Sequence, residues 1–279
     1  VSSSVMTFEH RGLVFNLLDT PGHEDFSEDT YRTLTAADCA VMVLDAAKGI
    51  EPQTLKLFEV CRLRDIPIIT FVNKFDREAR EVFDTLAEIE DKLALDVVPM
   101  QWPCASGRRF KGIAGLASNT FIPFRTDGEH GAPMPMGSPE MQALLDDENL
   151  SEEFGEEVEL AKEYGAFNEQ SFREGHMTPV YFGSALKKFG VLQLIDALAQ
   201  FAPGPQVESC QRAGQDSEVA PTDKNVSGFV FKVQANMDPN HRDRVAFLRL
   251  SSGVFKRGMK LKNTENKTLT VHNPILFFA

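Results

Sequence analysis

Three short segments of this sequence combine carboxylate, amide, hydroxyl and glycine groups directly after apolar runs. They are Asp19-Thr20-Pro21-Gly22-His23, Asn73-Lys74-Phe75-Asp76 and Ser184-Ala185-Leu186. Each apolar run is typical of a strand that is buried on both faces. Because open α/β sheets bind their ligands at the carboxyl ends of the strands, we expect all three segments at one edge of one sheet.

The first segment suits a metal ion and phosphate groups. The Asp19 carboxylate can bind Mg²⁺ on nucleotide phosphates, directly or through water. The N–H of Gly22 can point at a γ-phosphate, and His23 follows at a position from which it could orient an attacking water. Taken alone, the segment also fits a strand that ends in a Pro-Gly turn, and a single histidine is more often structural.

The other two segments suit guanine. Asp76 can accept two hydrogen bonds from N1–H and N2–H₂ of guanine, which adenine does not offer. Asn73 can reach N7, the stem of Lys74 can lie over the flat base, and the N–H of Ala185, beside Ser184, can reach O6. A site built on such hydrogen bonds disfavours other bases, because its own polar groups would lose their partners. Taken singly, these residues also fit helix caps, a surface charge and a turn.

The composition limits the class of protein. The chain has 279 residues, 42% hydrophobic and 25% charged, which is typical of a globular protein with about two domains. No apolar run is long enough to span a membrane, and the first residues do not resemble a signal peptide. The four cysteines form no CxxC pair, which favours reduced thiols and the cytoplasm. The net charge of −12 argues against broad non-specific nucleic-acid binding.

The elements that would position the three segments alternate between strands and helices. The predicted strands cover residues 13–18, 39–44, 66–72 and 178–183. One predicted helix opens at residue 51 and ends before Pro67, and two others cover residues 77–95 and 190–201. Strands separated by helix-length stretches indicate right-handed crossovers and a mostly parallel sheet, so the fold class is α/β. Residues 3–9 pair with the first of these strands as a predicted hairpin.

The rest of the chain departs from this rhythm. Residues 1–202 form a predicted first domain, in which residues 103–177, rich in glycine, proline and acidic residues, form an inserted subdomain. Its acidic run at 152–159 fits a solvated helix face. Residues 203–225 read as a linker. From residue 226 to 279 the apolar period changes to two, which predicts the start of a β-barrel.

The string DTPGHEDFSEDTYRTLTAAD, followed by VNKFDRE, resembles the translational GTPases. Residues 26–32 and 236–244 carry a closer match to the release-factor branch of that family. The resemblance implies a P-loop-type GTPase domain with helices on both faces of its sheet, then a second-domain β-barrel. It assigns the Mg²⁺-linked aspartate to Asp19, the γ-phosphate glycine to Gly22 and the catalytic histidine to His23. It assigns the guanine-binding role to the segments at 73–76 and 184–186.

The resemblance also implies an activity. It is that of a cytoplasmic, ribosome-dependent GTPase of translation termination, which binds GTP or GDP with Mg²⁺ and promotes dissociation of stop-codon-reading release factors. The implied partners are the ribosome and those release factors. One alternative is a translocase similar to elongation factor G, or a ribosomal protection GTPase. Others are a nucleotide-binding switch without hydrolysis and an enzyme that uses ATP.

One family motif is absent from these residues. No GxxxxGK[ST] sequence occurs; Gly107 and Gly112 have the glycine spacing, but Ile113 follows. The sequence therefore predicts that the phosphate loop lies upstream of Val1, and that the chain is an internal segment with little activity by itself.

Overall fold

The computed structural model describes residues 5–20, 28–125, 131–145, 148–212, 215–235, 244–272 and 274. The chain divides into two compact units. One unit is residues 39–202, and the other combines residues 1–38 with residues 203–279.

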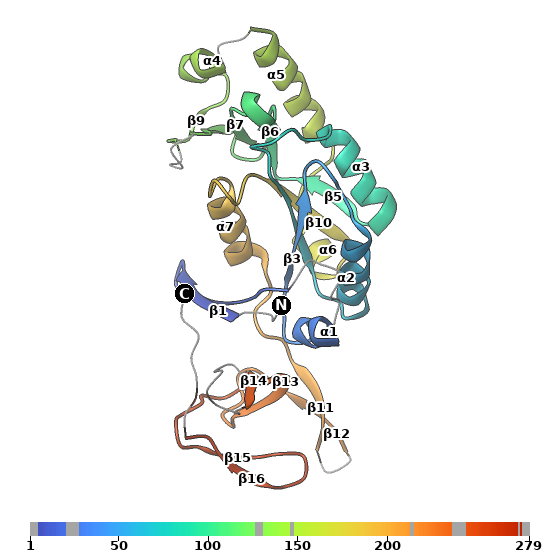
Figure 1. Cartoon of the computed structure of the whole chain (residues 1–279), viewed down its shortest axis with the longest axis vertical. Helices are drawn as coiled ribbons and strands as arrows, with labels where there is room; N and C mark the ends of the chain where they lie inside the picture. Colours follow the sequence, from blue (N-terminus) through green and yellow to red (C-terminus); the bar gives the residue numbers. More distant parts are fainter. Residues whose placement is uncertain are drawn as a thin grey trace. The chain divides into compact units, whose positions relative to one another are not determined.

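A four-stranded parallel sheet forms the centre of the unit 39–202 (Figure 1). Its strand order is β3 (Ala40–Asp45), β4 (Ile68–Asn73), β10 (Met177–Phe182), β5 (Asp96–Pro99). Both central strands, β4 and β10, are buried along nearly their whole length. This confirms the interpretation of their apolar runs as strands covered on both faces.

Helices cover both faces of this sheet. Figure 1 shows α7 (Val191–Phe201) on one side, with α2 (Pro52–Leu63) and α3 (Val82–Leu93) on the other. Alternate residues of β4 serve the two faces, and Ile69 and Phe71 pack in a cluster that α7 covers with Leu194 and Leu198. Pro52 occupies the first turn of α2, where its missing N–H costs no helical hydrogen bond.

The inserted subdomain contains more strand than its composition suggests. A second, antiparallel sheet has the order β6 (Gln101–Cys104), β7 (Gly112–Gly115), β8 (Thr120–Pro123), β9 (Met134–Pro135). A short 3₁₀ turn and the helices α4 (Pro139–Leu145), α5 (Glu148–Lys162) and α6 (Glu169–Arg173) complete this region. These strands could not be located from the sequence, because strands of two to four residues with glycine and proline carry almost no periodic signal.

The acidic run of the insertion lies on α5. Phe154 and Val158 are buried on one face of this helix, while most of the glutamates are exposed, as expected of a solvated face. Glu157 differs from the others, because its Oε2 accepts a hydrogen bond of 2.8 Å from Nε1 of the fully buried Trp102. One glutamate of the run therefore ties α5 to the sheet beneath it.

In the second unit, β1 (Val5–His10) and β2 (Leu13–Leu18) form the predicted hairpin. The turn residues Arg11 and Gly12 have φ of +50° and +76°, which suits a two-residue hairpin turn. The prediction that β2 is buried in the parallel sheet was wrong: β2 pairs with β1, and Val14 is 61% exposed. Strand side chains point to the two faces of a sheet, so the exposure of Leu13, Val14 and Leu17 means that the described residues leave the faces of this hairpin largely uncovered.

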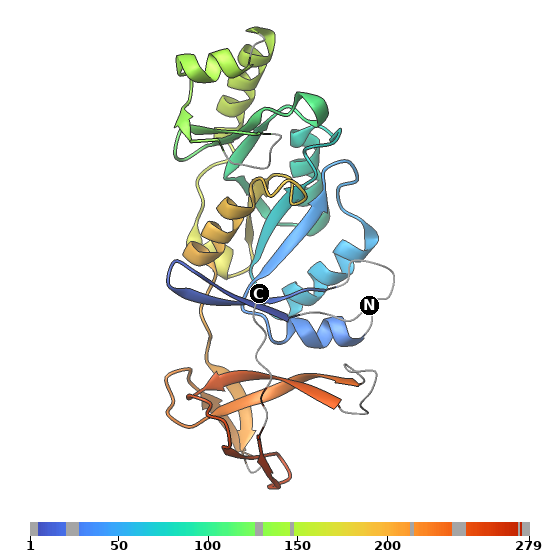
Figure 2. The ribbon, with the colours of Figure 1, turned by 60° about the vertical axis from the view of Figure 1, so that its left-hand side comes forward.

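The remaining strands of this unit are paired in hairpins. They are β11 (Glu208–Arg212) with β12 (Gln215–Val219), β13 (Ser227–Ala235) with β14 (Arg244–Ser252), and β15 (Lys260–Lys262) with β16 (Thr268–Thr270). Figure 2 shows β13 and β14 as a long twisted pair. The hairpin β11–β12 falls within the stretch expected to be a linker, where polar residues on both faces hid the strands. The predicted domain boundaries at residues 202 and 225 stay a prediction.

Helix α1 (Glu28–Leu34) precedes a contact within the same unit. Arg249 of β14 donates hydrogen bonds to the backbone oxygen of Ala36 and, at 2.5 Å, to Oδ1 of Asp38. Phe231 and Phe247 pack against Ala36 beside this ion pair. The residues that follow α1 are therefore attached to the β13–β14 pair by both charge and apolar contact.

Two expectations from the composition can be compared with the described residues. All four cysteines are free thiols, as predicted, and burial raises the pKa of Cys61 to about 11. Among the helices that the structure describes, none combines the length and the apolar character that crossing a membrane requires.

The packing of the unit 39–202 predicts that substitutions of two leucines on neighbouring helices change its stability by different amounts. Leu86 of α3 is fully buried, whereas Leu63 at the end of α2 is 85% exposed. Leu86→Ala should lower the free energy of unfolding by about 2–5 kcal/mol, because it removes buried surface and leaves a cavity. Leu63→Ala should change it by no more than about 0.5 kcal/mol. Equal losses for the two variants in denaturant titrations would contradict the placement of α3.

Candidate functional site

The carboxyl ends of β4 and β10 lie side by side and bring two of the three predicted segments together. The strands are parallel neighbours in which Val72 is level with Phe182. Gly183 continues the pairing, with its N–H 3.1 Å from the oxygen of Val72. Asn73 and Ser184 therefore leave the sheet at the same edge, as the sequence predicts.

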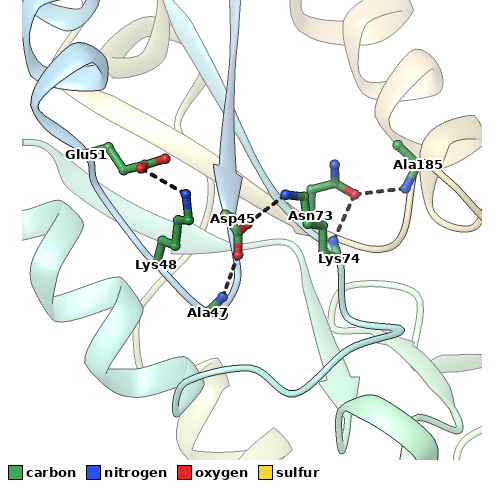
Figure 3. A network of polar contacts seen from close by, with 7 residues as sticks. All are labelled: Asp45, Ala47, Lys48, Glu51, Asn73, Lys74 and Ala185. Atoms are coloured by element: carbon green, nitrogen blue, oxygen red, sulfur yellow. Dashed lines mark hydrogen bonds and ion pairs between the residues drawn. The ribbon is translucent and has the colours of Figure 1, made fainter. Parts of the chain in front are cut away.

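The Asn73 side chain joins these two segments. Its Oδ1 accepts hydrogen bonds of 2.8 Å from the N–H of Lys74 and from the N–H of Ala185 (Figure 3). Since both partners are N–H donors, the hydrogen-bond network fixes the orientation of the amide, with Nδ2 as its donor group. A donor at this position has the polarity that N7 of a purine requires.

A second link runs between Asp76 and Ser184. The Ser184 hydroxyl donates to Oδ1 of Asp76 at 2.5 Å, and Ser184 is fully buried. A carboxylate has about four lone-pair positions, so one hydroxyl leaves acceptor capacity for the two N–H groups of a guanine edge. Ser184 thereby holds the carboxylate in one orientation.

Phe75 anchors the segment 73–76 to the core. The predicted ligand-binding segment includes this residue, but its side chain is 3% exposed and packs edge-on against Phe182, with ring centres 5.6 Å apart. The ring centre of Phe110, in the insertion, lies 6.0 Å from that of Phe75. The Phe75 N–H also donates to the oxygen of Gly183. Phe75 thus holds the polar residues on either side of it in place.

Two glycines allow the segment after β10 to turn back on itself. A Cβ at Gly183 would lie 2.3 Å from the backbone oxygen of Phe189, so no other residue fits there without movement. Gly190 has φ of +79°, and a Cβ there would meet the oxygen of Phe182. Between them, Ser184 and Phe189 exchange backbone hydrogen bonds and close a tight loop.

Ala185 and Leu186 occupy this loop in different ways. The Ala185 N–H is already bound to Asn73, so its predicted contact with O6 of guanine would have to share or replace that hydrogen bond. The Leu186 side chain is 73% exposed. Its place in the predicted ligand-binding segment stays a prediction.

The first predicted segment is only partly described. Asp19 is exposed just after β2, and Thr20 is half-buried. Pro21, Gly22 and His23 lie outside the described residues. Asp19 and Asp76 belong to different units, so their convergence at one sheet edge stays a prediction.

Metal ligands do not converge in the described part of the chain. No group of three or more histidine, cysteine, aspartate or glutamate side chains is placed there to hold a metal ion. The Mg²⁺-binding role assigned to Asp19 stays a prediction; phosphate oxygens and water are ligands that Mg²⁺ usually keeps.

Asp45 was not among the site residues predicted from the sequence. Asp45 is the last residue of β3 and lies level with Asn73 in the neighbouring strand. Its Oδ2 accepts a charged hydrogen bond of 2.7 Å from Nζ of Lys74. The available signal was an acidic residue at the end of a third apolar run, at the same edge of the same sheet.

The geometry predicts that Asn73 is the residue that keeps the two loops together. Asn73→Ala removes the acceptor of two backbone N–H groups, at a cost of about 1–3 kcal/mol for each group left without a partner. We expect faster amide hydrogen exchange in the peptide that contains Ala185, measured by mass spectrometry. Unchanged exchange there would show that other contacts hold this loop.

Two family models together match most of this chain. Residues 1–204 match the family model of the elongation factor Tu GTP-binding domain, and residues 225–279 match that of elongation factor G domain 2. A crystal structure of a protein from Thermus thermophilus shares the fold with a TM-score of 0.71 and 24% identity, over 96% of this chain and 40% of its own.

Two curated relatives are named peptide chain release factor 3. The protein from Ligilactobacillus salivarius is 48% identical over 285 residues, which is 100% of this chain and 54% of the relative. The protein from Lactobacillus acidophilus is 50% identical over 264 residues, 93% of this chain and 50% of the relative. The chain spans about half the length of these relatives. On the match to its first 204 residues, it belongs to the family of the elongation factor Tu GTP-binding domain, the translational GTPases.

Proposed function

We propose that this chain is the guanine-nucleotide-binding part of a ribosome-dependent GTPase of translation termination. The observation that carries the proposal is the linked pair of loops in which Asn73 binds Ala185 and Asp76 binds Ser184. The choice of termination rests on the relatives named peptide chain release factor 3. In this role the protein promotes dissociation of stop-codon-reading release factors from the ribosome, in the cytoplasm.

The residues of the site suit the chemistry of guanine and phosphate. Asp76 accepts hydrogen bonds from the guanine edge, Asn73 donates to it, and the stem of Lys74 covers the base. Asp19 holds Mg²⁺ through water, Gly22 donates its N–H to the γ-phosphate, and His23 orients the attacking water. The metal supplies neutralisation of the phosphate charge that develops during transfer.

A second candidate is a translocase similar to elongation factor G, or a ribosomal protection GTPase. The match of residues 225–279 to elongation factor G domain 2 supports this second candidate. The two candidates share their chemistry and differ in the step they serve. A recycling assay with the full-length protein on stalled termination complexes separates them, since only a termination factor should release the bound release factor there.

We expect His23→Ala to lower ribosome-stimulated GTP hydrolysis by about 10²–10⁴-fold, the range found when a group that positions or activates the nucleophile is lost. Binding of GTP should not change, because the side chain acts on the water. His176→Ala is the matched control, since His176 is exposed and its nearest charged partner is Glu174. Hydrolysis that survives in His23→Ala would favour a different water-positioning residue. A wild-type protein that binds GTP but does not hydrolyse it with ribosomes would indicate a switch instead.

We expect Asp76→Asn to move base preference from guanine to xanthine. The amide no longer accepts from both N1–H and N2–H₂, and the loss of hydrogen bonds to a charged group should weaken GDP binding about 100-fold. Asp84→Asn, at an exposed position of α3, is the control and should leave binding unchanged. Titrations with GDP and xanthosine diphosphate measure the shift. Equal weakening for both nucleotides would argue against recognition of the base edge by Asp76.

A further inference from the structure

Asp45 lies at the rim of the proposed guanine site without belonging to any of its loops. It ends β3 level with Asn73 of β4, so both side chains emerge at the same edge of the sheet (Figure 3). Its carboxylate is bound at both oxygens. Oδ1 accepts the N–H of Ala47 at 2.9 Å, and Oδ2 accepts Nζ of Lys74 at 2.7 Å.

The backbone of Lys74 is held by hydrogen bonds of the loop itself, independently of the Lys74 side chain. Its φ of +77° lies in the left-handed region, which is unfavourable for a residue with a Cβ and therefore needs support from its surroundings. The Lys74 N–H donates to Asn73, and the Lys74 oxygen accepts the N–H of Arg77 at 2.9 Å. The direction in which the lysine leaves the chain is thus set by the loop itself.

The position of the ammonium group is set by Asp45. The Lys74 side chain is 45% exposed, so water alone would leave its four-carbon stem free to sample many rotamers. The Asp45 side chain is only 16% exposed and is itself held by the turn at Ala47. A fixed carboxylate paired with a mobile ammonium places the stem of Lys74 along the rim.

The charge state of Asp45 supports this arrangement. Burial raises the pKa of Asp45, but the hydrogen bonds from Lys74 and from the Ala47 N–H lower it by more than burial raises it. The pKa of Asp45 therefore lies below its ordinary value. The carboxylate is therefore ionised at neutral pH, and the pair carries opposite full charges. Hydrogen bonds between such charges are stronger than those between neutral groups.

We propose that Asp45 is a positioning residue of the guanine site, which orders the Lys74 side chain so that its stem forms a ready surface for the purine ring. The inference rests on the proposed function. A lysine side chain that is already ordered loses little rotamer entropy when the base binds. Because this entropic cost is smaller, the affinity for the nucleotide is higher.

Loss of Asp45 should lower the affinity for guanine nucleotides without changing the selectivity for the base. Asp45 touches the lysine and not the edge of the base, so its loss should weaken GDP and GTP equally. The preference for guanine over xanthine should remain, because it depends on Asp76. Most of the weakening should appear as faster dissociation, as is usual for variants of one binding site.

Asp45→Asn tests the role of the charge in the full-length protein. Asparagine keeps the shape and the oxygen that accepts the Ala47 N–H, but it loses the anion that binds Lys74. For a partly exposed ion pair we expect about three- to tenfold weaker binding of a fluorescent GDP. Glu51→Gln is the matched control. It removes the exposed ion pair between Lys48 and Glu51, whose Nζ and Oε1 lie 3.2 Å apart, and should change GDP binding by less than about twofold.

A double-mutant cycle with Lys74→Met tests whether Asp45 acts through the lysine. Once Lys74 is methionine, adding Asp45→Asn should weaken GDP binding no further. Lys74→Arg, which keeps a cation for Asp45, should bind GDP more tightly than Lys74→Met. These lysine variants leave the Asp45 turn in place, so they carry the test even if Asp45→Asn lowers the melting temperature.

Three results would overturn the inference while the proposed function stands. They are wild-type affinity in Asp45→Asn, equal weakening by Asp45→Asn with and without Lys74, and a loss in Glu51→Gln as large as that in Asp45→Asn. A wild-type protein that binds no guanine nucleotide would overturn the proposed function as well. The two failures are therefore distinguished by the affinity of the wild-type protein.

Discussion

The hydrogen bonds of Asn73 are the interaction on which the candidate site depends. One side-chain oxygen joins two loops that lie 112 residues apart in the chain, and it does so at the edge where two parallel strands end. In a parallel sheet the carboxyl ends of neighbouring strands lie at the same edge, because every crossover returns the chain to the same side. The polar loops can then touch each other while the strands remain in the core.

Below these loops the structure is almost entirely apolar. Val72, Val180 and Phe182 are each 1% exposed or less, and Phe75 adds an aromatic ring directly under the polar residues. This contrast has a physical consequence. The core holds the backbone rigid at the point where the amide and carboxylate groups must keep their directions, so geometry at the rim follows from packing beneath it.

The parts of the fold that depend on local sequence could be predicted, whereas those that depend on contacts between distant residues could not. The strands β4 and β10 and the polar residues after them follow from local sequence, because uninterrupted apolar runs indicate burial on both faces. The exposure of β2 does not, since it depends on which elements far away in the chain cover its two faces. The β11–β12 hairpin and the β6–β9 sheet are short or polar, and their periodicity was too weak to detect.

The site shows the same limit. Asn73, Asp76 and Ser184 were predicted as neighbours from the rule that ligand sites gather at strand ends, and the structure brings them together. The pair Asp45–Lys74 was missed, because it requires both the order of the strands and the rotamer of a long side chain. The position of the rim follows from the sequence, whereas the contacts along it depend on the three-dimensional arrangement of the strands and side chains.

The ring of Phe75 has a consequence for the inserted subdomain. Phe110 and Phe124 of the insertion pack with Phe189, and Phe110 also meets Phe75, so the insertion supplies aromatic cover beneath both loops. The insertion is therefore packed into the core of the unit 39–202. A shortened relative that lacked it would need another apolar cover for the rings of Phe75 and Phe189, or would leave the apolar layer beneath both loops open to water.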